Sequence, residues 1–509
     1  MRLADILRHL GGAGAAPLAR FLERQRWFAA KARGAASVRV RDAAAISEDP
    51  LILLLLLDAD EDRYYVPLSV RPTAGPAVPA EREVYRLGGW AIIDAHWDPD
   101  FGRHVLLAVA AARRLEASAG WFSCHALSPW DGPSLAEIPA LAVRPLSAEQ
   151  SNTSIRLGPA LIAKSFRRPQ AGINPDFEML HFLSSRFAHV PRLAGWIEYA
   201  GAAREPATIA LVQSFVENTG DGWSHALSHL RALADALTPA APPGEPRDVE
   251  RRLPDVAADF IGQMRQLGSI TGGLHAALAA DPSAAAFMPE PVTREDVARW
   301  SRGLEDDLAR LRADLRRQHP GLPETVRSAV APLLDEQRSV AGVAADLSRL
   351  VQGGTHKIRC HGDYHLGQVL RTAEGFVVID FEGEPARPVG ERRAKHSPLR
   401  DVAGMLRSFN YAVHAAAMER PAAGREALGA WLETWERLVR EAFRQGYLDA
   451  ARKSPVGLVP LSEEGFVRAC AAFELEKALY ELRYELNHRP DWIPIPAAGI
   501  SRILGAARP

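Results

Sequence analysis

The sequence predicts an α+β protein in which a β-rich N-terminal part precedes a larger helical part. Up to about residue 218, short apolar runs rich in β-branched and aromatic residues recur between turn signals. Beyond that point, apolar residues recur at intervals of three or four, as on one face of a helix. A chain of 509 residues with 47% hydrophobic composition is long enough for two or three structural units, each with a core.

The β-rich part contains two groups of strand-like runs. The first group follows a helix-like start and comprises residues 37–41, 51–57, 64–70 and 90–94. The second group comprises residues 154–157, 161–166 and 209–216. We expect the first group to form an N-terminal subdomain over residues 1–110 and the second to form a β-rich lobe over residues 111–218. Residues 51–57 are all aliphatic but far too few to cross a membrane, which indicates a buried strand.

The helical part is expected to cover residues 219–509. Leucines at 227, 230, 233 and 237 open its periodic pattern. A loop rich in Pro and Ala, residues 239–246, follows them. Similar helical periodicity recurs around residues 255–280, 293–317, 325–351, 423–446 and 463–487.

Charge and cysteine content exclude several classes of protein. The 61 basic and 62 acidic residues give a net charge of -1, which argues against nucleic acid or an anionic membrane as the main partner. Cys124, Cys360 and Cys470 lie far apart, so neither a disulfide framework nor a zinc motif is indicated. The N-terminus has no long apolar core typical of a signal peptide. We therefore expect a cytoplasmic protein.

Two acids in the helical part, Asp363 and Asp380, carry the strongest chemical signal. Each stands at the edge of an apolar run, and residues 372–375 read as a tight turn between the runs, so a hairpin would bring the two acids together. ATP-dependent phosphoryl transfer needs one carboxylate to accept the proton of the attacking hydroxyl and another to hold Mg²⁺. Gln368, five residues after Asp363, stands where protein kinases place their second metal ligand. The pattern predicts a kinase active site.

The β-rich part supplies candidates for binding the nucleotide. Lys164 follows an apolar strand-like run, and Glu178 begins a helix-like stretch fourteen residues later, as the strand lysine and helix glutamate of a two-lobed kinase do. No glycine-rich loop precedes Lys164. A polar turn at residues 149–154 stands in its place, and its amides and hydroxyls suit phosphates. Taken singly, the lysine is better explained by a surface position, and the turn is equally compatible with an ordinary hairpin.

Two other classes of function fit part of this pattern. A metal-dependent hydrolase would use His361, Asp363 and His365 as ligands, but this arrangement leaves Asp380 unexplained. A catalytically silent kinase fold acting as a partner module has no chemical need to retain Lys164, Asp363 and Asp380 together. The phosphotransferase interpretation explains all of these residues.

Several motifs in order along nearly the whole chain resemble those of the bacterial maltokinases. They lie at residues 24–31, 149–154, 164–168, 172–176, 361–371, 380–385, 397–409 and 480–492. The resemblance implies a two-lobed, aminoglycoside-phosphotransferase-like kinase fold preceded by a cap subdomain. It also implies transfer of the γ-phosphate of ATP to the anomeric hydroxyl of maltose, giving maltose 1-phosphate for α-glucan synthesis. Some family members are fused to a trehalose synthase, which makes that enzyme a candidate partner. Tyr364 departs from the aliphatic residue expected beside the base.

The resemblance also implies a role for individual residues. Asp363 would be the catalytic base, Gln368 and Asp380 the Mg²⁺ ligands, and Glu382 a further metal-binding group. Lys164 would contact the ATP phosphates and be oriented by Glu178. The acceptor would contact His361, and the nucleotide would contact Ser151, Asn152, Thr153 and Ser154 through its phosphates and Gln213, Phe215 and Val216 through adenine.

The C-terminal segment has the composition of a sugar site. Sugars offer hydroxyls to charged side chains and a flat C–H face to aromatic rings, and a helix ending before Pro490 supplies both groups at intervals of four. The candidates are Tyr480, Glu481, Tyr484, Glu485, Arg489 and Trp492. Acids on adjacent helical turns are also typical of a solvated face. Spacing alone leaves glucosamine, another monosaccharide or an aminoglycoside open as acceptors. Asp401 and Arg400 are expected either to hold the catalytic loop or to touch the substrate.

Overall fold

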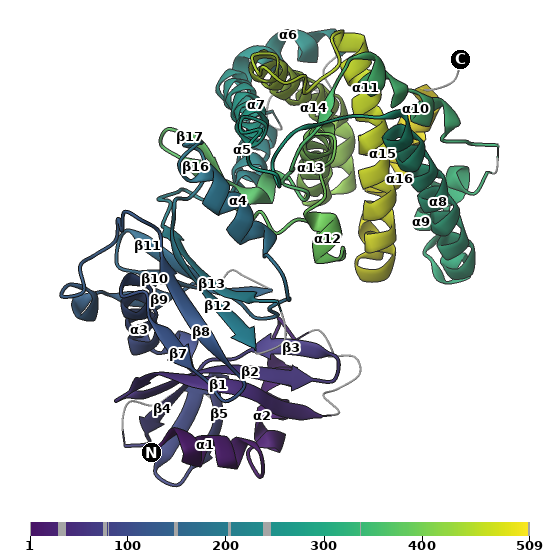
Figure 1. Cartoon of the computed structure of the whole chain (residues 1–509). Coiled ribbons are helices and arrows are strands. Elements are labelled where there is room, and N and C mark those ends of the chain that lie inside the picture. The colour runs from purple at the N-terminus through teal and green to yellow at the C-terminus, as the bar shows by residue number, and fades with distance from the viewer. Residues whose placement is uncertain are drawn as a thin grey trace. The chain divides into compact units, whose positions relative to one another are not determined.

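The computed structural model describes residues 2–28, 37–74, 79, 81–146, 151–201, 205–237, 246–335 and 337–506. The chain folds into two compact units, coloured in sequence order in Figure 1. Unit 1 comprises Met1–Ser185 and Pro191–Val216, and unit 2 comprises Arg186–Val190 and Glu217–Pro509. The predicted α+β class is confirmed, because unit 1 is built on two sheets and unit 2 is mainly helical.

The N-terminal sheet of unit 1 has six antiparallel strands. Its strands run in the order β1-β2-β4-β6-β5, and β3 pairs with β2 beside this path. Two helices, α1 (Leu3–Leu10) and α2 (Ala15–Arg24), precede it. The strands are β1 (Val38–Glu48), β2 (Leu51–Ala59), β3 (Asp62–Tyr65), β4 (Leu68–Pro72), β5 (Glu83–Leu87) and β6 (Trp90–Asp94).

The aliphatic run 51–57 forms most of β2 and is buried on both faces. Because side chains alternate along a strand, Leu53, Leu55 and Leu57 pack with the helices α1 and α2. Ile52, Leu54 and Leu56 pack instead into a second core together with residues of the next sheet. The two sheets of unit 1 therefore share one hydrophobic core, and a division near residue 110 stays a prediction.

The second sheet of unit 1 has seven strands in the order β7-β8-β12-β13-β11-β10-β9. Helix α3 (Pro99–Ala110) packs against it, and α4 (Pro175–Leu183) follows β11. The strands are β7 (Arg114–Glu116), β8 (Gly120–Ala126), β9 (Val143–Pro145), β10 (Asn152–Leu157), β11 (Leu161–Phe166), β12 (Leu193–Gly201) and β13 (Ala207–Ser214). Strand β11 pairs with both β10 and β13, so Lys164 lies on an interior strand.

One expected strand is interrupted. The run 64–70 forms the end of β3 and the start of β4, with Val66 and Pro67 between them. Proline has no backbone N–H to donate, which ends the ladder with β2 at this point. Beyond the break, β4 pairs with both β2 and β6.

Long helices form the body of unit 2. Figure 1 shows α15 beside α13, and α14 beside α7, and these pairs are in direct contact. The helices are α5 (Gly222–Leu237), α6 (Pro246–Val256), α7 (Ala258–Leu278), α8 (Arg294–Gln318), α9 (Glu324–Val330), α10 (Ala341–Ala345), α11 (Ser348–Gln352), α12 (Val389–Arg392), α13 (Leu399–Met418), α14 (Ala422–Ala451), α15 (Glu463–His488) and α16 (Pro494–Ala506). Two small antiparallel sheets accompany them. The strands β14 (Glu290–Pro291) and β15 (His356–Lys357) form the first, and the hairpin of β16 (Val369–Thr372) and β17 (Gly375–Val378) forms the second.

The helical segment expected at 325–351 is broken into the short helices α9, α10 and α11. Pro332 follows α9 and lies in a single 3₁₀ turn, where its ring prevents the α-helix from continuing. The predicted loop at 239–246 falls mostly outside the described residues. Within the described ranges, we find no helix that is both long and apolar enough to cross a membrane.

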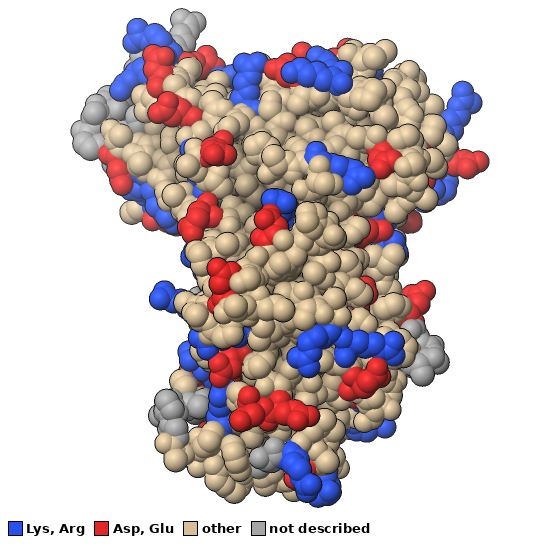
Figure 2. Space-filling view, turned by 60° about the vertical axis from the view of Figure 1, so that its left-hand side comes forward, with Lys and Arg blue, Asp and Glu red and all other residues tan. Residues whose placement is uncertain are grey.

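The surface agrees with the balanced composition. On the face shown in Figure 2, basic and acidic side chains lie next to one another in each unit. Such mixing gives no extended positive surface of the kind that binds nucleic acid or anionic lipid on this face.

Candidate active site

The hairpin of β16 and β17 brings the two predicted loops together, as the sequence indicates. Its register pairs Val369 with Val378 and closes at Thr372 and Gly375. The loops are tied directly as well, because the Ile379 N–H donates to the Gln368 carbonyl at 3.0 Å. The segment before β16 and the segment after β17 therefore meet at one end of the hairpin.

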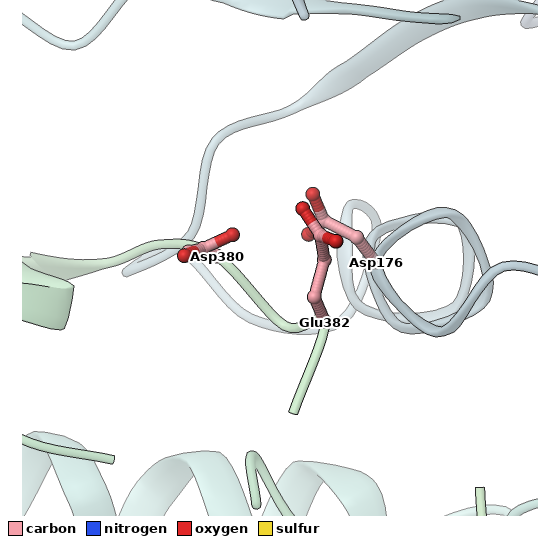
Figure 3. Close-up of side chains that lie close together, drawn as sticks. All are labelled: Asp176, Asp380 and Glu382. Atoms are coloured by element: carbon pink, nitrogen blue, oxygen red, sulfur yellow. The ribbon is translucent and has the colours of Figure 1, made fainter. Parts of the chain in front are cut away.

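The loop after β17 carries the candidate metal ligands Asp380 and Glu382, drawn in Figure 3. The Nε2 of Gln368 donates to Asp380 Oδ2 at 3.1 Å. This hydrogen bond joins a candidate ligand of one loop to a candidate ligand of the other. Asp380 has a φ of 66°, a left-handed conformation that costs a non-glycine residue about 1–3 kcal/mol.

The donor set of this loop fits Mg²⁺. One carboxylate oxygen of Asp380 and one of Glu382 lie within 4.8 Å of each other. Because Gln368 uses its Nε2 on Asp380, its amide oxygen is the atom left for an ion. Carboxylate and amide oxygens are hard ligands, which Mg²⁺ prefers over the thiolates and imidazoles that suit zinc.

Asp363 forms a partly buried ion pair with Lys477 of α15. The Lys477 Nζ lies 3.0 Å from Asp363 Oδ1 and 3.7 Å from Glu384 Oε1. Burial by itself would raise the pKa of Asp363, but the charge of Lys477 and then that of His365 lower it to about 2. Burial would lower the pKa of Lys477, yet Asp363 and Glu384 together raise it well above its usual value. The aspartate is thus held ionised, as a general base must be at neutral pH.

A hollow of about 370 Å³, counting its part open to solvent, adjoins this ion pair. Its charged lining includes both carboxylates and cations. Glu476 accepts from Arg400 at 2.9 Å and from Arg387 at 3.3 Å. The lining residues include Asp363, Glu384, Arg387, Arg400, Phe473, Glu476, Lys477 and Tyr480.

Asp401 holds the loop that carries Asp363, which is one of the two roles expected for it. This buried carboxylate accepts from the backbone N–H of His361 at 2.8 Å and of Gly362 at 2.9 Å. His275 Nε2 lies 3.0 Å from the same carboxylate, and its Nδ1 lies 3.0 Å from the Tyr447 hydroxyl. The loop that carries Asp363 is therefore fixed to the helical core by charge-assisted hydrogen bonds.

Helix α13 approaches the same loop closely at Gly404. A Cβ on this glycine would lie 2.5 Å from the Tyr364 carbonyl oxygen, so a larger residue would push the helix away. Tyr364, the departure from the expected aliphatic residue, is buried and its hydroxyl lies 2.9 Å from Thr271 Oγ1. The tyrosine thus packs into the core behind the loop and also forms part of the lining of the hollow in front of it.

His361 also supports the loops. Its ring is 1% exposed; Nε2 lies 2.9 Å from the Ile379 carbonyl oxygen, and Nδ1 accepts from the Asp363 N–H at 3.4 Å. The sequence predicts that His361 contacts the acceptor. With both ring nitrogens used by the backbone, His361 joins the two loops instead. The same contacts remove a ligand from the metal-hydrolase interpretation.

In unit 1, Lys164 is buried and its Nζ lies 2.9 Å from Asp176 Oδ2. Asp176 stands in the first turn of α4, two residues before Glu178, and is labelled in Figure 3. The sequence analysis expected Glu178 to orient the lysine and did not single out Asp176. A helix N-terminal carboxylate paired with a strand lysine is nevertheless the arrangement that a kinase uses to aim its lysine at phosphate.

The expected phosphate turn is described from Ser151 onward, and residues 149–150 lie outside the described part. Asn152, Thr153 and Ser154 form the start of β10, so only Ser151 belongs to the turn itself. Thr153 Oγ1 accepts from Arg167 Nε at 2.8 Å.

The expected adenine segment lies at the end of β13. Gln213 is the residue before the strand ends at Ser214, and Val216 closes unit 1. The N–H of Phe215 donates to the Ala160 carbonyl at 2.7 Å, and the guanidinium of Arg156 lies 3.8 Å from the centre of its ring.

Only some of the expected sugar-binding residues on helix α15 lie at the hollow. Lys477, Tyr480 and Tyr484 recur at i, i+3 and i+7 and so share one face, of which Lys477 and Tyr480 line the hollow. Glu481, four residues after Lys477, lies beside this stripe, but it and Glu485 are paired within the protein. Glu481 pairs with Arg407 at 2.8 Å, and buried Glu485 accepts from Arg489 at 2.7 Å. Trp492 stacks on Tyr411 with ring centres 6.0 Å apart. The lining of the hollow does not include Glu481, Glu485, Arg489 or Trp492, and their assignment to the acceptor stays a prediction.

Sequence reasoning missed Lys477, Glu384 and Glu476 as members of the site. Lys477 stands three residues before Tyr480, so extending the helix face of Tyr480 and Tyr484 by one turn toward the N-terminus would have found it. Glu384 and Glu476 carried no comparable signal, because only the folded chain brings the loop after β17 beside α15.

Replacing Lys477 by Met should move the acid limb of the pH–rate profile to higher pH. Without the ammonium, burial is left to raise the pKa of Asp363, by about one to three pH units. A base with a raised pKa is protonated, and inactive, at a pH where the parent still works. The measurement is kcat/KM between pH 4 and 8 for the parent and Lys477→Met. An acid limb that does not move would contradict the role given to the ion pair.

Comparison with known proteins agrees with the fold. Residues 21–98 match the model of the maltokinase N-terminal cap domain, and residues 142–438, more than half of the chain, match that of the phosphotransferase enzyme family. The glucosamine kinase of Streptacidiphilus jiangxiensis is 27% identical over 379 residues, which cover 72% of this chain and 74% of that protein. The glucosamine kinase of Mycolicibacterium smegmatis is 27% identical over 365 residues, 71% of this chain and 79% of that protein.

A solved structure of a glucosamine kinase in complex with glucosamine, ADP and inorganic phosphate has a TM-score of 0.63 and 20% identity. The match covers 95% of this chain and 98% of that one. Crystal form B of a glucosamine kinase has a TM-score of 0.64 at 20% identity, covering 96% and 99%. These likenesses show a common fold. The chain belongs to the phosphotransferase enzyme family, with a kinase-like fold preceded by a maltokinase N-terminal cap domain.

Proposed function

We propose that this protein is a sugar kinase that transfers the γ-phosphate of ATP to the anomeric hydroxyl of maltose, giving maltose 1-phosphate and ADP. The observation that carries the proposal is the stripe of Lys477, Tyr480 and Tyr484, which begins at the ionised Asp363 and runs along one face of α15. Its last member, Tyr484, is 43% exposed and stacks on His488 with ring centres 4.3 Å apart.

In the proposed mechanism, Asp363 accepts the proton of the anomeric hydroxyl while that oxygen attacks the γ-phosphorus of ATP. The bond between the γ-phosphorus and the β–γ bridging oxygen breaks, and ADP leaves. Lys164, aimed by Asp176, would hold the phosphates, and Asp380, Glu382 and Gln368 would hold Mg²⁺. When bound, the ion neutralises phosphate charge. Asp401 keeps the base in place throughout by its bonds to the loop amides.

The length of the stripe favours a disaccharide. A single ring placed with its anomeric hydroxyl at Asp363 can use Lys477 and Tyr480, which line the same hollow. Tyr484 lies one helical turn beyond Tyr480, about 6 Å along the axis, where the second ring of maltose would reach. An exposed tyrosine offers that ring a flat apolar face and a hydroxyl.

Glucosamine is a second candidate because two relatives and the most similar folds reported above are glucosamine kinases. The carboxylates Glu384 and Glu476 in the hollow would suit its ammonium group. Both are already paired with arginine, Glu384 with Arg387 and Glu476 with Arg400, so an ammonium would have to displace a cation. The maltose proposal does not require this exchange.

A panel of sugars with ATP and Mg²⁺, scored for ADP release, tests the acceptor. Maltose should be phosphorylated far better than glucose, and trehalose, which has no free anomeric hydroxyl, should be inert. Tyr484→Ala should lower kcat/KM for maltose roughly tenfold while KM for ATP barely changes, as expected when one substrate contact is lost. Val467→Ala, an exposed position on the same helix, is the matched control. A preference for glucosamine over maltose would reject maltose but keep the kinase.

The resemblance to maltokinases extends the proposal beyond the reaction. The product would feed α-glucan synthesis, and an enzyme that makes maltose from trehalose, a trehalose synthase, would supply the acceptor. A cytoplasmic location would follow from ATP and sugar phosphates as reactants. Co-purification with a trehalose synthase from the same cells would test the partnership.

A further inference from the structure

Unit 2 contains a second large hollow, which shares no lining residue with the active-site hollow. It lies between α13, α14 and α16 and measures about 1560 Å³, counting its part open to solvent. Its lining includes Asn410 of α13, Glu436 and Arg440 of α14, and Arg502 of α16. The proposed reaction uses none of these residues.

Glu436 is the reason to regard this hollow as a site. The residue is only 7% exposed, and one carboxylate oxygen, Oε2, accepts from Asn410 Nδ2 at 2.9 Å. The other oxygen, Oε1, is buried and has no hydrogen-bond partner in the described part of the chain. A buried carboxylate oxygen without a partner costs about 1–3 kcal/mol or more, so a partner from outside the protein is expected.

The nearest cations do not supply that partner. Arg502 Nη2 lies 3.6 Å and Arg440 Nη1 3.8 Å from Glu436 Oε1, both beyond hydrogen-bond length. Arg440 is also engaged elsewhere, because it donates to both oxygens of Glu474 and to the Leu406 carbonyl. Arg502 is 54% exposed and forms no closer ion pair among the described residues.

The position of Glu436 is fixed by a chain of hydrogen bonds that runs from α14 through α13 to α15. Asn410, which donates to Glu436, accepts from Arg407 Nη1 at 3.1 Å. Arg407 in turn donates through Nε to Glu481 of α15 at 2.9 Å. Because these groups are buried and mutually bonded, Glu436 cannot turn its free oxygen toward another protein group.

We propose that this hollow binds a carbohydrate through its hydroxyl groups. A hydroxyl both donates and accepts, so a single one placed between Glu436 Oε1 and Arg502 Nη2 satisfies both. The acids Glu433 and Glu436 lie among the basic residues of the lining, and Arg440 is neutralised by Glu474, which favours an uncharged polyol over a phosphate. The hollow also has room for several sugar rings.

Equilibrium dialysis of labelled maltotriose against the full-length protein without ATP tests this site. The parent should bind more than one equivalent, and Tyr480→Ala, which weakens the active-site hollow, should keep one. Arg502→Ala and Glu436→Gln, each combined with Tyr480→Ala, should weaken the remaining site roughly ten- to a hundredfold, as for a lost charge-assisted hydrogen bond.

Arg265→Ala on α7 is the matched control, because Arg265 is similarly exposed at 57% and lies outside the hollow. With Tyr480→Ala it should bind like Tyr480→Ala alone. Melting curves show whether Glu436→Gln is folded, and Arg502→Ala, at an exposed position, provides the independent test. Binding of a single equivalent that Tyr480→Ala abolishes would mean that only water fills the hollow and would overturn the proposal. Inorganic phosphate that binds in place of sugar, and is lost with Arg502→Ala, would overturn it too.

Discussion

Asp363→Asn should abolish turnover while the fold and ATP binding stay nearly intact. Asparagine has the shape of aspartate but cannot accept the proton of the attacking hydroxyl, and loss of a general base costs about 10²–10⁴-fold in kcat. The measurement is ADP release with maltose and with glucosamine, together with ATP binding by calorimetry. Both acceptors should fail equally, because the base serves either one.

Asp449→Asn, an exposed carboxylate paired with Arg265, is a suitable control for the chemical change and should behave like the parent. Melting curves reveal how far the loss of the ion pair between Asp363 and Lys477 destabilises the fold. Turnover of Asp363→Asn within a few-fold of the parent would remove Asp363 from the role of base.

Asp380→Ala should also remove activity, and the parent should be inactive in EDTA and recover with Mg²⁺ or Mn²⁺. The loop after β17 offers only hard oxygen donors, so loss of one carboxylate removes a ligand that the remaining groups do not replace. Asp380→Asn separates charge from shape, since asparagine tolerates the left-handed φ of 66° and keeps an oxygen for Gln368. It should be nearly as inactive as Asp380→Ala.

Glu374→Ala provides the control for this experiment, because Glu374 is an exposed acid in the turn of the same hairpin. Its activity and metal dependence should match those of the parent. Recovery of the EDTA-treated parent with Zn²⁺ but not Mg²⁺ would favour the metal-hydrolase chemistry instead.

Local patterns were enough to predict the β-rich and helical parts and the hairpin that joins Asp363 to Asp380. A turn of four residues between two apolar runs allows few other arrangements, so short-range reasoning succeeds there. The same reasoning failed at residues 64–70, where the effect of Pro67 on the ladder outweighed the apolar pattern.

The support of the site depends on contacts between residues far apart in the chain. Lys477 meets Asp363 across 114 positions, and His275 meets Asp401 across 126. No spacing rule connects such residues, because the packing of α7, α13 and α15 brings them together. Helical periodicity placed Glu481 and Glu485 correctly on adjacent turns, but it cannot tell that Glu481 meets Arg407 of the neighbouring helix α13.

The ion pair of Asp363 and Lys477 also affects how readily ATP is hydrolysed by water when no sugar is bound. Under the proposed mechanism, an enzyme that has bound ATP alone presents a base whose charge is already neutralised across 3.0 Å. A lone water molecule offers little in exchange for breaking that pair, whereas a sugar brings several hydroxyls to Asp363, Lys477 and Tyr480 at once. Hydrolysis of ATP by water is therefore slow when the acceptor is scarce, and the γ-phosphate is transferred mainly when a sugar is bound.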